Sequence, residues 1–156
     1  MFENRYYMNG KSEKPDDRLG FLLTQVSFLK QRIVNAALRE LDITYIQFVI
    51  LAGIMELAQE GEPVTQQNIS DERRLDKAMV SNVVKTLIAR GYLNREEHPT
   101  DKRAFTLSLT AAGKIKACEG KKIAHRIDTV FFEGIDQAAF FESLTQLLKN
   151  NNTRNE

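Results

Sequence analysis

Three polar side chains recur every four residues at Lys77, Ser81 and Lys85, so a helix would gather them on one face. The lysines can neutralise phosphates, the serine can donate to one, and the amide of neighbouring Asn82 can pair with adenine through two hydrogen bonds. No carboxylate interrupts this face, and the small side chain of Ala78 admits close approach of a base or a thymine methyl. Such a face suits the major groove of DNA. A merely solvated helix surface is the commoner explanation when the stripe stands alone.

A second candidate group consists of Asp101 and Arg103, with Lys102 between them. A carboxylate can hold a guanidinium in one orientation through a charge-assisted pair, and an arginine oriented in advance loses less entropy on binding. The narrow minor groove of A·T-rich DNA attracts such an arginine, while Lys102 can meet the phosphates. The alternative for Asp101 and Arg103 is an ordinary surface salt bridge, worth roughly 0–1 kcal/mol.

Apolar residues at helical spacing predict that the first group lies on a helix from Asp76 to Arg90, which Gly91 ends. Its inward stripe would consist of aliphatic residues, namely Val80, Val83, Val84, Leu87 and Ile88. A short helix over 66–73 precedes it, and two extended runs, 92–97 and 104–109, enclose the second group. This order of helix, helix and charged hairpin is typical of a winged helix-turn-helix, whose second helix enters the major groove.

The short helix offers further candidate contacts at both ends. Thr65 and Gln66 can present donors to a phosphate, although capping explains Thr65 equally well. Arg73 and Arg74 indicate a basic elbow near the DNA backbone, or ion pairs with the acidic residues just before them. A later basic run faces DNA or is simply solvated; its members are Lys114, Lys116, Lys121, Lys122 and Arg126.

The remaining apolar patterns predict a mainly α-helical protein whose small β-hairpin forms the wing, and they indicate a dimer. The helix over 16–41 has an apolar stripe too broad for one small neighbour to cover. Thr44 and Gln47 have the form of a capping box at the start of the next helix. A helix from Thr110 to Phe132 would be roughly 34 Å long, comparable with the separation of successive major grooves on one face of DNA.

The last helix would begin after Asp136 and would turn four apolar side chains inward, Phe140, Leu144, Leu147 and Leu148. The predicted organisation is a flexible arm over 1–15, a helical dimerisation region over 16–41 and 110–149, and a winged helix-turn-helix lobe over 42–109. A two-fold dimer of this kind predicts a pseudo-palindromic operator.

Five segments resemble the MarR family of bacterial transcription regulators, and the resemblance extends from about Leu19 to Leu148. The segments are Ile43–Phe48, Asp76–Ser81, Leu87–Leu93, His98–Ala104 and Leu107–Gly113. The resemblance implies a homodimeric, ligand-responsive repressor that binds double-stranded DNA and in which the Asp-x-Arg of the wing works as a unit. It also implies release by a small aromatic or anionic effector bound between the dimer helices and the winged lobe.

The recognition helix departs from the family pattern at three positions. Ala78 and Met79 stand where many relatives have Ser and Thr, and Asn82 stands where many have Arg, so the operator cannot be inferred from relatives. The candidate DNA-binding residues are Thr65, Gln66, Lys77, Ala78, Met79, Ser81, Asn82, Lys85, Asp101, Lys102 and Arg103. A dimeric adaptor that keeps the winged fold without binding DNA is the alternative.

Composition and residue inventory weigh against other classes of protein. A net charge of +1 with 28% charged and 42% hydrophobic residues is ordinary for a soluble globular chain. Only His98 and His125 could act as a histidine base, and no phosphate-binding glycine loop is present, so we expect neither an enzyme nor a cofactor. A single cysteine, Cys118, excludes an internal disulfide, and one Cys with two distant His lacks the spacing of a structural zinc site. Cys118 is either a packing residue or a redox sensor. We expect a cytoplasmic protein with no membrane span.

Overall fold

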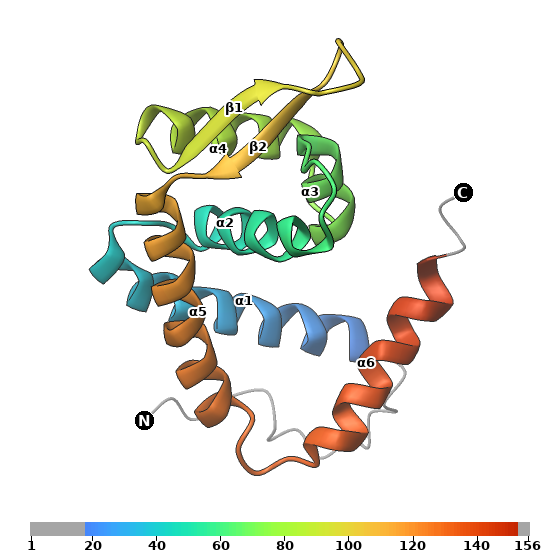
Figure 1. The fold of residues 1–156 in the computed structure, drawn as a ribbon. Coiled ribbons are helices and arrows are strands. Elements are labelled where there is room, and N and C mark those ends of the chain that lie inside the picture. Colours follow the sequence, from blue (N-terminus) through green and yellow to red (C-terminus); the bar gives the residue numbers. More distant parts are fainter. Residues whose placement is uncertain (1–17, 153–156) are drawn as a thin grey trace, which may run out of the picture.

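The computed structural model describes residues 18–152, so the arm predicted over 1–15 lies outside the described residues. The described chain is mainly helical with one antiparallel hairpin, as the sequence predicts (Figure 1). Its elements are α1 (Leu19–Ala37), α2 (Tyr45–Leu57), α3 (Gln66–Arg73), α4 (Lys77–Ala89), β1 (Leu93–Glu97), β2 (Phe105–Leu109), α5 (Ala111–Phe131) and α6 (Gln137–Asn152), with 3-10 turns at Leu38–Leu41 and Ala58–Glu60.

Helix α2 is the centre of the fold, because it lies between α1 on one side and the hairpin with α3 and α4 on the other (Figure 1). Its side chains Ile50, Leu51 and Ile54 are fully buried. The neighbouring elements contribute the rest of one continuous core, mainly Val34, Leu38, Ile69, Val80, Val84, Leu87, Leu93 and Leu107. Helix α5 also packs against α2, and Gly120 permits this because a Cβ there would lie 2.5 Å from Cδ2 of Phe48. The winged lobe and α5 therefore share a core.

Polar caps begin the helices where the sequence predicts. Thr44 forms the predicted capping box with Gln47, and Thr65 forms a similar one with Asn68. Asp76 and Thr110 accept a hydrogen bond from the backbone three residues later, at the starts of α4 and α5. These local bonds set the ends of the helices that carry the candidate site.

Helices α1 and α6 expose apolar side chains that nothing in the described chain covers. On α1 these include Leu19, Leu23 and Phe28. The inward placement predicted for the last two leucines of α6 is wrong within one chain, because Leu147 and Leu148 are 51% and 53% exposed. The reason is geometric: α6 diverges from the body after the turn at Gly134, and it has no buried residue (Figure 1).

Within residues 18–152, no single helix is long and apolar enough to cross a membrane. Helices α1 and α2 with their adjoining 3-10 turns reach that length and apolarity when taken together, but they are bent by 80° at the break between them.

Candidate nucleic-acid interface

Helix α4 presents the predicted polar face to solvent. Val80, Val84 and Leu87 are fully buried and hold one side of the helix against the core. The opposite side exposes the predicted contact residues Lys77, Ala78, Asn82 and Lys85, whereas Ser81 is only half-exposed. Met79 is 41% exposed, so its side chain is not needed to fill the core. The structure thus gathers the α4 candidates on one accessible surface.

The two lysines of this surface have no ion pair among the described residues, and the helix itself contains no carboxylate. The Asp76 side chain beyond its start is occupied, since it accepts a hydrogen bond from the Met79 amide at 2.9 Å. Positive charge on α4 is therefore available to an external anion such as a phosphate.

The hairpin is attached to the start of α3 by backbone hydrogen bonding. The Leu107 amide donates to the Val64 carbonyl at 2.8 Å, and Thr65 forms an isolated bridge with Thr106. Thr65 is also the cap of α3: its hydroxyl accepts from the Asn68 amide at 3.2 Å, and its own amide donates to Asn68 Oδ1 at 2.8 Å. Capping and pairing account for Thr65, while Gln66 follows it half-exposed.

A compact joint connects the end of α4, the root of the hairpin and the start of α5. Gly91 ends α4 with a φ of +73°, a conformation that favours glycine. The Thr110 hydroxyl donates to the Gly91 carbonyl at 2.7 Å, and the Thr110 amide donates to the Tyr92 carbonyl at 3.1 Å. A Cβ on Gly113 would lie 2.0 Å from that same Tyr92 oxygen, so only glycine fits there. The hairpin is consequently fixed relative to both α4 and α5.

The wing tip shows a different Asp101–Arg103 contact from the one predicted. Asp101 Oδ1 accepts a hydrogen bond from the backbone amide of Arg103 at 2.9 Å, and no ion pair joins their side chains in the part of the chain that the structure describes. The expected pairing of carboxylate with guanidinium is therefore wrong. The reason is local, because the short Asp side chain easily reaches an amide two residues on. Lys102 and Arg103 are both exposed at the tip.

Sequence reasoning missed two residues that organise the wing. The ring of His98 accepts hydrogen bonds from the backbone of the tip, and the guanidinium of Arg95 lies 3.7 Å from the centre of the Phe105 ring. The strand register could have indicated the second contact, because Arg95 is paired with Leu107 and Phe105 lies diagonally across the hairpin on the same face. No pattern in the sequence indicates the first.

Arg73 and Arg74 do not pair with Asp71 or Glu72. Arg73 forms an ion pair with Glu56 of α2, and Arg74 donates to the side chain of Asn152 in α6. The sequence left two alternatives for these arginines, and the one that paired them with Asp71 or Glu72 is therefore wrong.

Much of the basic run on α5 is also engaged inside the chain. Lys121 pairs with Glu56, Lys122 pairs with Glu119, and Lys116 donates to the Leu41 carbonyl.

Glu56 joins three helices. Partial burial raises the pKa of its carboxyl, but the hydrogen bonds and charges of Lys121 and Arg73 outweigh burial, so the pKa lies below its ordinary value of 4.5. At neutral pH Glu56 on α2 is therefore an anion, and its ion pairs with Arg73 and Lys121 connect α2 to α3 and to α5.

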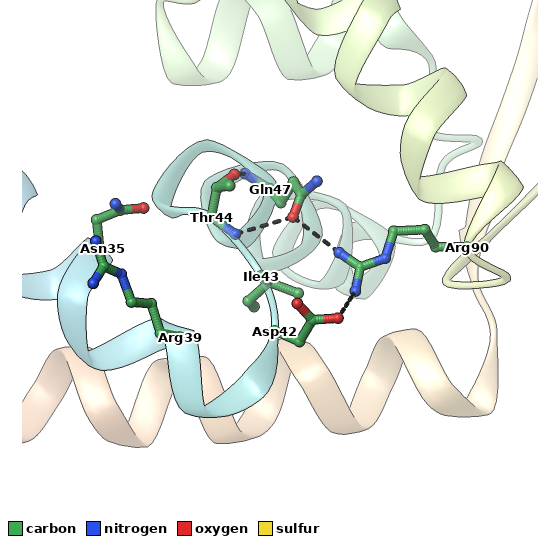
Figure 2. Close-up of a pocket in the computed structure, with 7 residues that line it drawn as sticks. All are labelled: Asn35, Arg39, Asp42, Ile43, Thr44, Gln47 and Arg90. Carbon is green, nitrogen blue, oxygen red and sulfur yellow. Dashed lines mark hydrogen bonds and ion pairs between the residues drawn. The ribbon is translucent and has the colours of Figure 1, made fainter.

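A cavity of about 260 Å³ lies between α1, the start of α2 and the end of α4 (Figure 2). Its lining consists of Asn35, Arg39, Asp42, Ile43, Thr44, Gln47 and Arg90. Figure 2 shows Arg90 pointing toward Asp42, with which it forms an ion pair, and toward the amide oxygen of Gln47. The cavity thus contains one paired guanidinium and a second, that of Arg39, from the 3-10 turn after α1.

Cys118 is exposed and lies 3.9 Å, sulfur to sulfur, from Met55. The described residues include no group of three or more His, Cys, Asp or Glu able to hold a metal ion.

Comparisons with known proteins agree with this geometry. The MarR family model matches residues 41–104. The uncharacterized HTH-type transcriptional regulator YdcH of Bacillus subtilis (strain 168) is 37% identical over 143 residues, which cover 91% of this chain and 97% of YdcH. CouR from Rhodococcus jostii RHA1, bound to p-coumaroyl-CoA, has a similar structure, with a TM-score of 0.75, 26% identity and coverage of 88% and 94% of the two chains. A mutant MarR from Escherichia coli complexed with operator DNA shares the fold at a TM-score of 0.73 and 23% identity, over 88% of this chain and 99% of that one.

Proposed function

Because this chain belongs to the MarR family of transcriptional regulators, and not to a family of enzymes, we propose that it is a cytoplasmic repressor that binds a pseudo-palindromic operator as a homodimer. The observation that carries the proposal is the carboxylate-free face of α4, whose Lys77 and Lys85 form no ion pair with any described residue. Beside it lies a wing that is fixed to the same core and carries Arg103 at its tip. In this proposal residues 42–109 bind DNA, and 16–41 with 110–149 form the dimer.

Helix α4 enters the major groove. Its two lysines contact phosphates, Ser81 donates to a phosphate, and Asn82 reads an adenine. Ala78 and Met79 are exposed apolar groups at the first turn, where they can contact thymine methyls. Thr65 and Gln66, at the start of α3, approach the phosphate backbone of the same half-site.

The wing enters the flanking minor groove. Arg103 is exposed, and the Asp101 carboxylate holds its backbone, so the tip presents a guanidinium where a narrow groove concentrates negative potential. Lys102 contacts the adjacent phosphates. The attachment of the hairpin to α3, α4 and α5 fixes the root of the wing relative to α4 in each protomer.

Dimerisation places two such lobes on one face of DNA. The apolar surfaces of α1 and α6 are those that a second copy covers, since Phe28 and Phe141 are 64% and 70% exposed in the single chain. Helix α5 has 21 residues and is roughly 32 Å long. That length is close to the separation of about 34–36 Å between half-sites one helical turn apart.

The cavity beside Arg39 and Arg90 supports control by a small aromatic or anionic effector. An anion that attracts Arg90 competes with Asp42, and this changes the link between the end of α4 and the segment before α2. Such a ligand favours the arrangement of lobes to which it binds more tightly, and thereby lowers the population that fits DNA. CouR, which has a similar structure, is bound to p-coumaroyl-CoA.

Selection from a library of random duplexes, followed by sedimentation of the protein alone and with the selected duplex, tests this function. We expect an inverted repeat to be enriched and two chains to bind each duplex. Phe141→Glu should reduce both dimerisation and binding, whereas Ala138→Glu, at an exposed alanine of α6, is the matched surface control. A monomer, or the absence of any enriched sequence, would contradict the proposal and favour the adaptor.

A further inference from the structure

The ring of His98 organises the wing tip from inside the loop. Its Nδ1 lies 3.1 Å from the Asp101 amide nitrogen and 3.3 Å from the Thr100 amide nitrogen, and the Thr100 hydroxyl oxygen lies 3.4 Å from the same atom. Two backbone bonds then close the loop, from the His98 amide to the Ala104 carbonyl at 3.2 Å and from the Ala104 amide to the Asp101 carbonyl at 3.0 Å. The half-buried imidazole is thus the acceptor around which the tip turns.

These partners determine the state of the imidazole. A backbone amide can only donate, so Nδ1 must accept and cannot carry a hydrogen. While Nδ1 accepts these hydrogen bonds, the ring is neutral and its hydrogen is on Nε2. A second proton would enter at Nδ1, where it would face two N–H groups and would remove both hydrogen bonds.

A short chain of contacts leads from this ring to the exposed arginine. His98 fixes the backbone at Thr100 and Asp101, and the Asp101 carboxylate in turn accepts from the Arg103 amide at 2.9 Å. We propose that His98 is a positioning residue for DNA binding, which holds Arg103 in place only while Nδ1 is unprotonated. The proposal rests on the proposed function, since Arg103 is the group that meets DNA there.

The charged side chains of the hairpin and of the helix packed against it are all of types other than imidazole. The hairpin carries three cations and three carboxylates, namely Arg95, Lys102, Arg103, Glu96, Glu97 and Asp101. Strand β2, which pairs with β1, contains no charged residue, and α4, which packs against β1, adds Lys77 and Lys85. Side chains of these types do not ordinarily titrate between about pH 6 and 8, whereas imidazole does.

The direction of the effect separates this role from general electrostatics. Added positive charge on a protein ordinarily strengthens its attraction to phosphates, so charge alone would make DNA binding tighter as the pH falls. Loss of the wing shape predicts the opposite, namely weaker binding as pH falls from 8 to 6.

Three variants test the role on the duplex selected by the wild-type protein, with affinity measured by fluorescence anisotropy at pH 8, 7 and 6. His98→Asn keeps an oxygen acceptor near the position of Nδ1 but cannot be protonated, and His98→Ala removes the acceptor. His125→Asn changes the other histidine, which is exposed on α5. At pH 8 we expect His98→Asn to preserve affinity within a few-fold, and His98→Ala to bind about tenfold more weakly.

Between pH 8 and 6 the wild type and His125→Asn should lose about tenfold in affinity, while His98→Asn should change little. Wild-type affinity for His98→Ala at pH 8, or a wild-type pH profile for His98→Asn, would overturn the role. Nitrogen NMR of the free protein at pH 8 gives a readout without DNA: Nδ1 should be unprotonated and Nε2 protonated, and the reverse tautomer would overturn the proposal. If the wild type selects no duplex, the proposed function fails, and the DNA-binding role of His98 fails with it, even where NMR confirms the tautomer.

Discussion

The Arg103 amide donates a hydrogen bond to the Asp101 carboxylate across 2.9 Å, so the two residues are joined through the backbone and not through opposite charges. This relationship predicts an unequal effect of two substitutions. Asp101→Asn keeps an oxygen that can accept from the amide, and its affinity for the selected duplex should stay within a few-fold of wild type. Asp101→Ala loses the acceptor and should bind about tenfold more weakly. Equal loss in both variants would show that the charge of Asp101 matters instead.

The lysines of α4 should reveal phosphate binding through the salt dependence of DNA affinity. Lys77→Ala and Lys85→Ala should each lower the slope of log affinity against log salt by about 0.9 for every phosphate that a protomer no longer neutralises. Lys122→Ala is the control, because Lys122 lies on α5 and pairs with Glu119 at 2.8 Å. The role assigned to either lysine is wrong if its variant keeps the wild-type slope.

Gly113 should be intolerant of even one added methyl group. The Cβ of Gly113→Ala would lie 2.0 Å from a backbone oxygen of Tyr92, which cannot move without shifting the root of the wing. We expect a loss of stability of about 1–3 kcal/mol, measured by urea unfolding at one fixed protein concentration. Ala112→Ser, at the exposed neighbouring position, should change stability little. Wild-type stability for Gly113→Ala would mean that the wing and α5 can separate at this joint without cost.

The ion pairs of Glu56 predict a pH-dependent stability. Because its pKa is lowered in the folded chain, its contribution is fully present above the ordinary value of 4.5 and is lost as pH falls through the lowered value. Glu56→Gln should cost about 1 kcal/mol at pH 7, a modest amount because the carboxylate is partly exposed, and less at pH 3. Unfolding of Glu62→Gln, at an exposed residue, provides the comparison. The same deficit for Glu56→Gln at both pH values would contradict this role.

The sequence predicts most of the winged lobe because its signals are local. Thr44, Thr65, Asp76 and Thr110 each cap a helix through atoms three residues away, and the aliphatic spacing from Val80 to Leu87 identifies the buried side of α4. The same helical period predicts that the opposite face of α4 is exposed to solvent.

Other features depend on information that periodicity lacks. The stripe that contains Leu147 and Leu148 indicates an apolar face on α6, but not that the described chain leaves this face exposed. At the wing tip, whether Asp101 meets the guanidinium or the amide of Arg103 depends on backbone angles in a loop, and so does the contact of His98 with the tip.

Sequence-specific DNA binding is tested most directly by the ratio of two affinities of the wild-type protein, for its selected inverted repeat and for a duplex of the same composition in scrambled order. We expect the selected duplex to bind about a thousandfold or more tightly near 150 mM salt, and both affinities to fall steeply as salt increases. Equal affinity for the two duplexes, or no binding to either at low salt, would contradict the account.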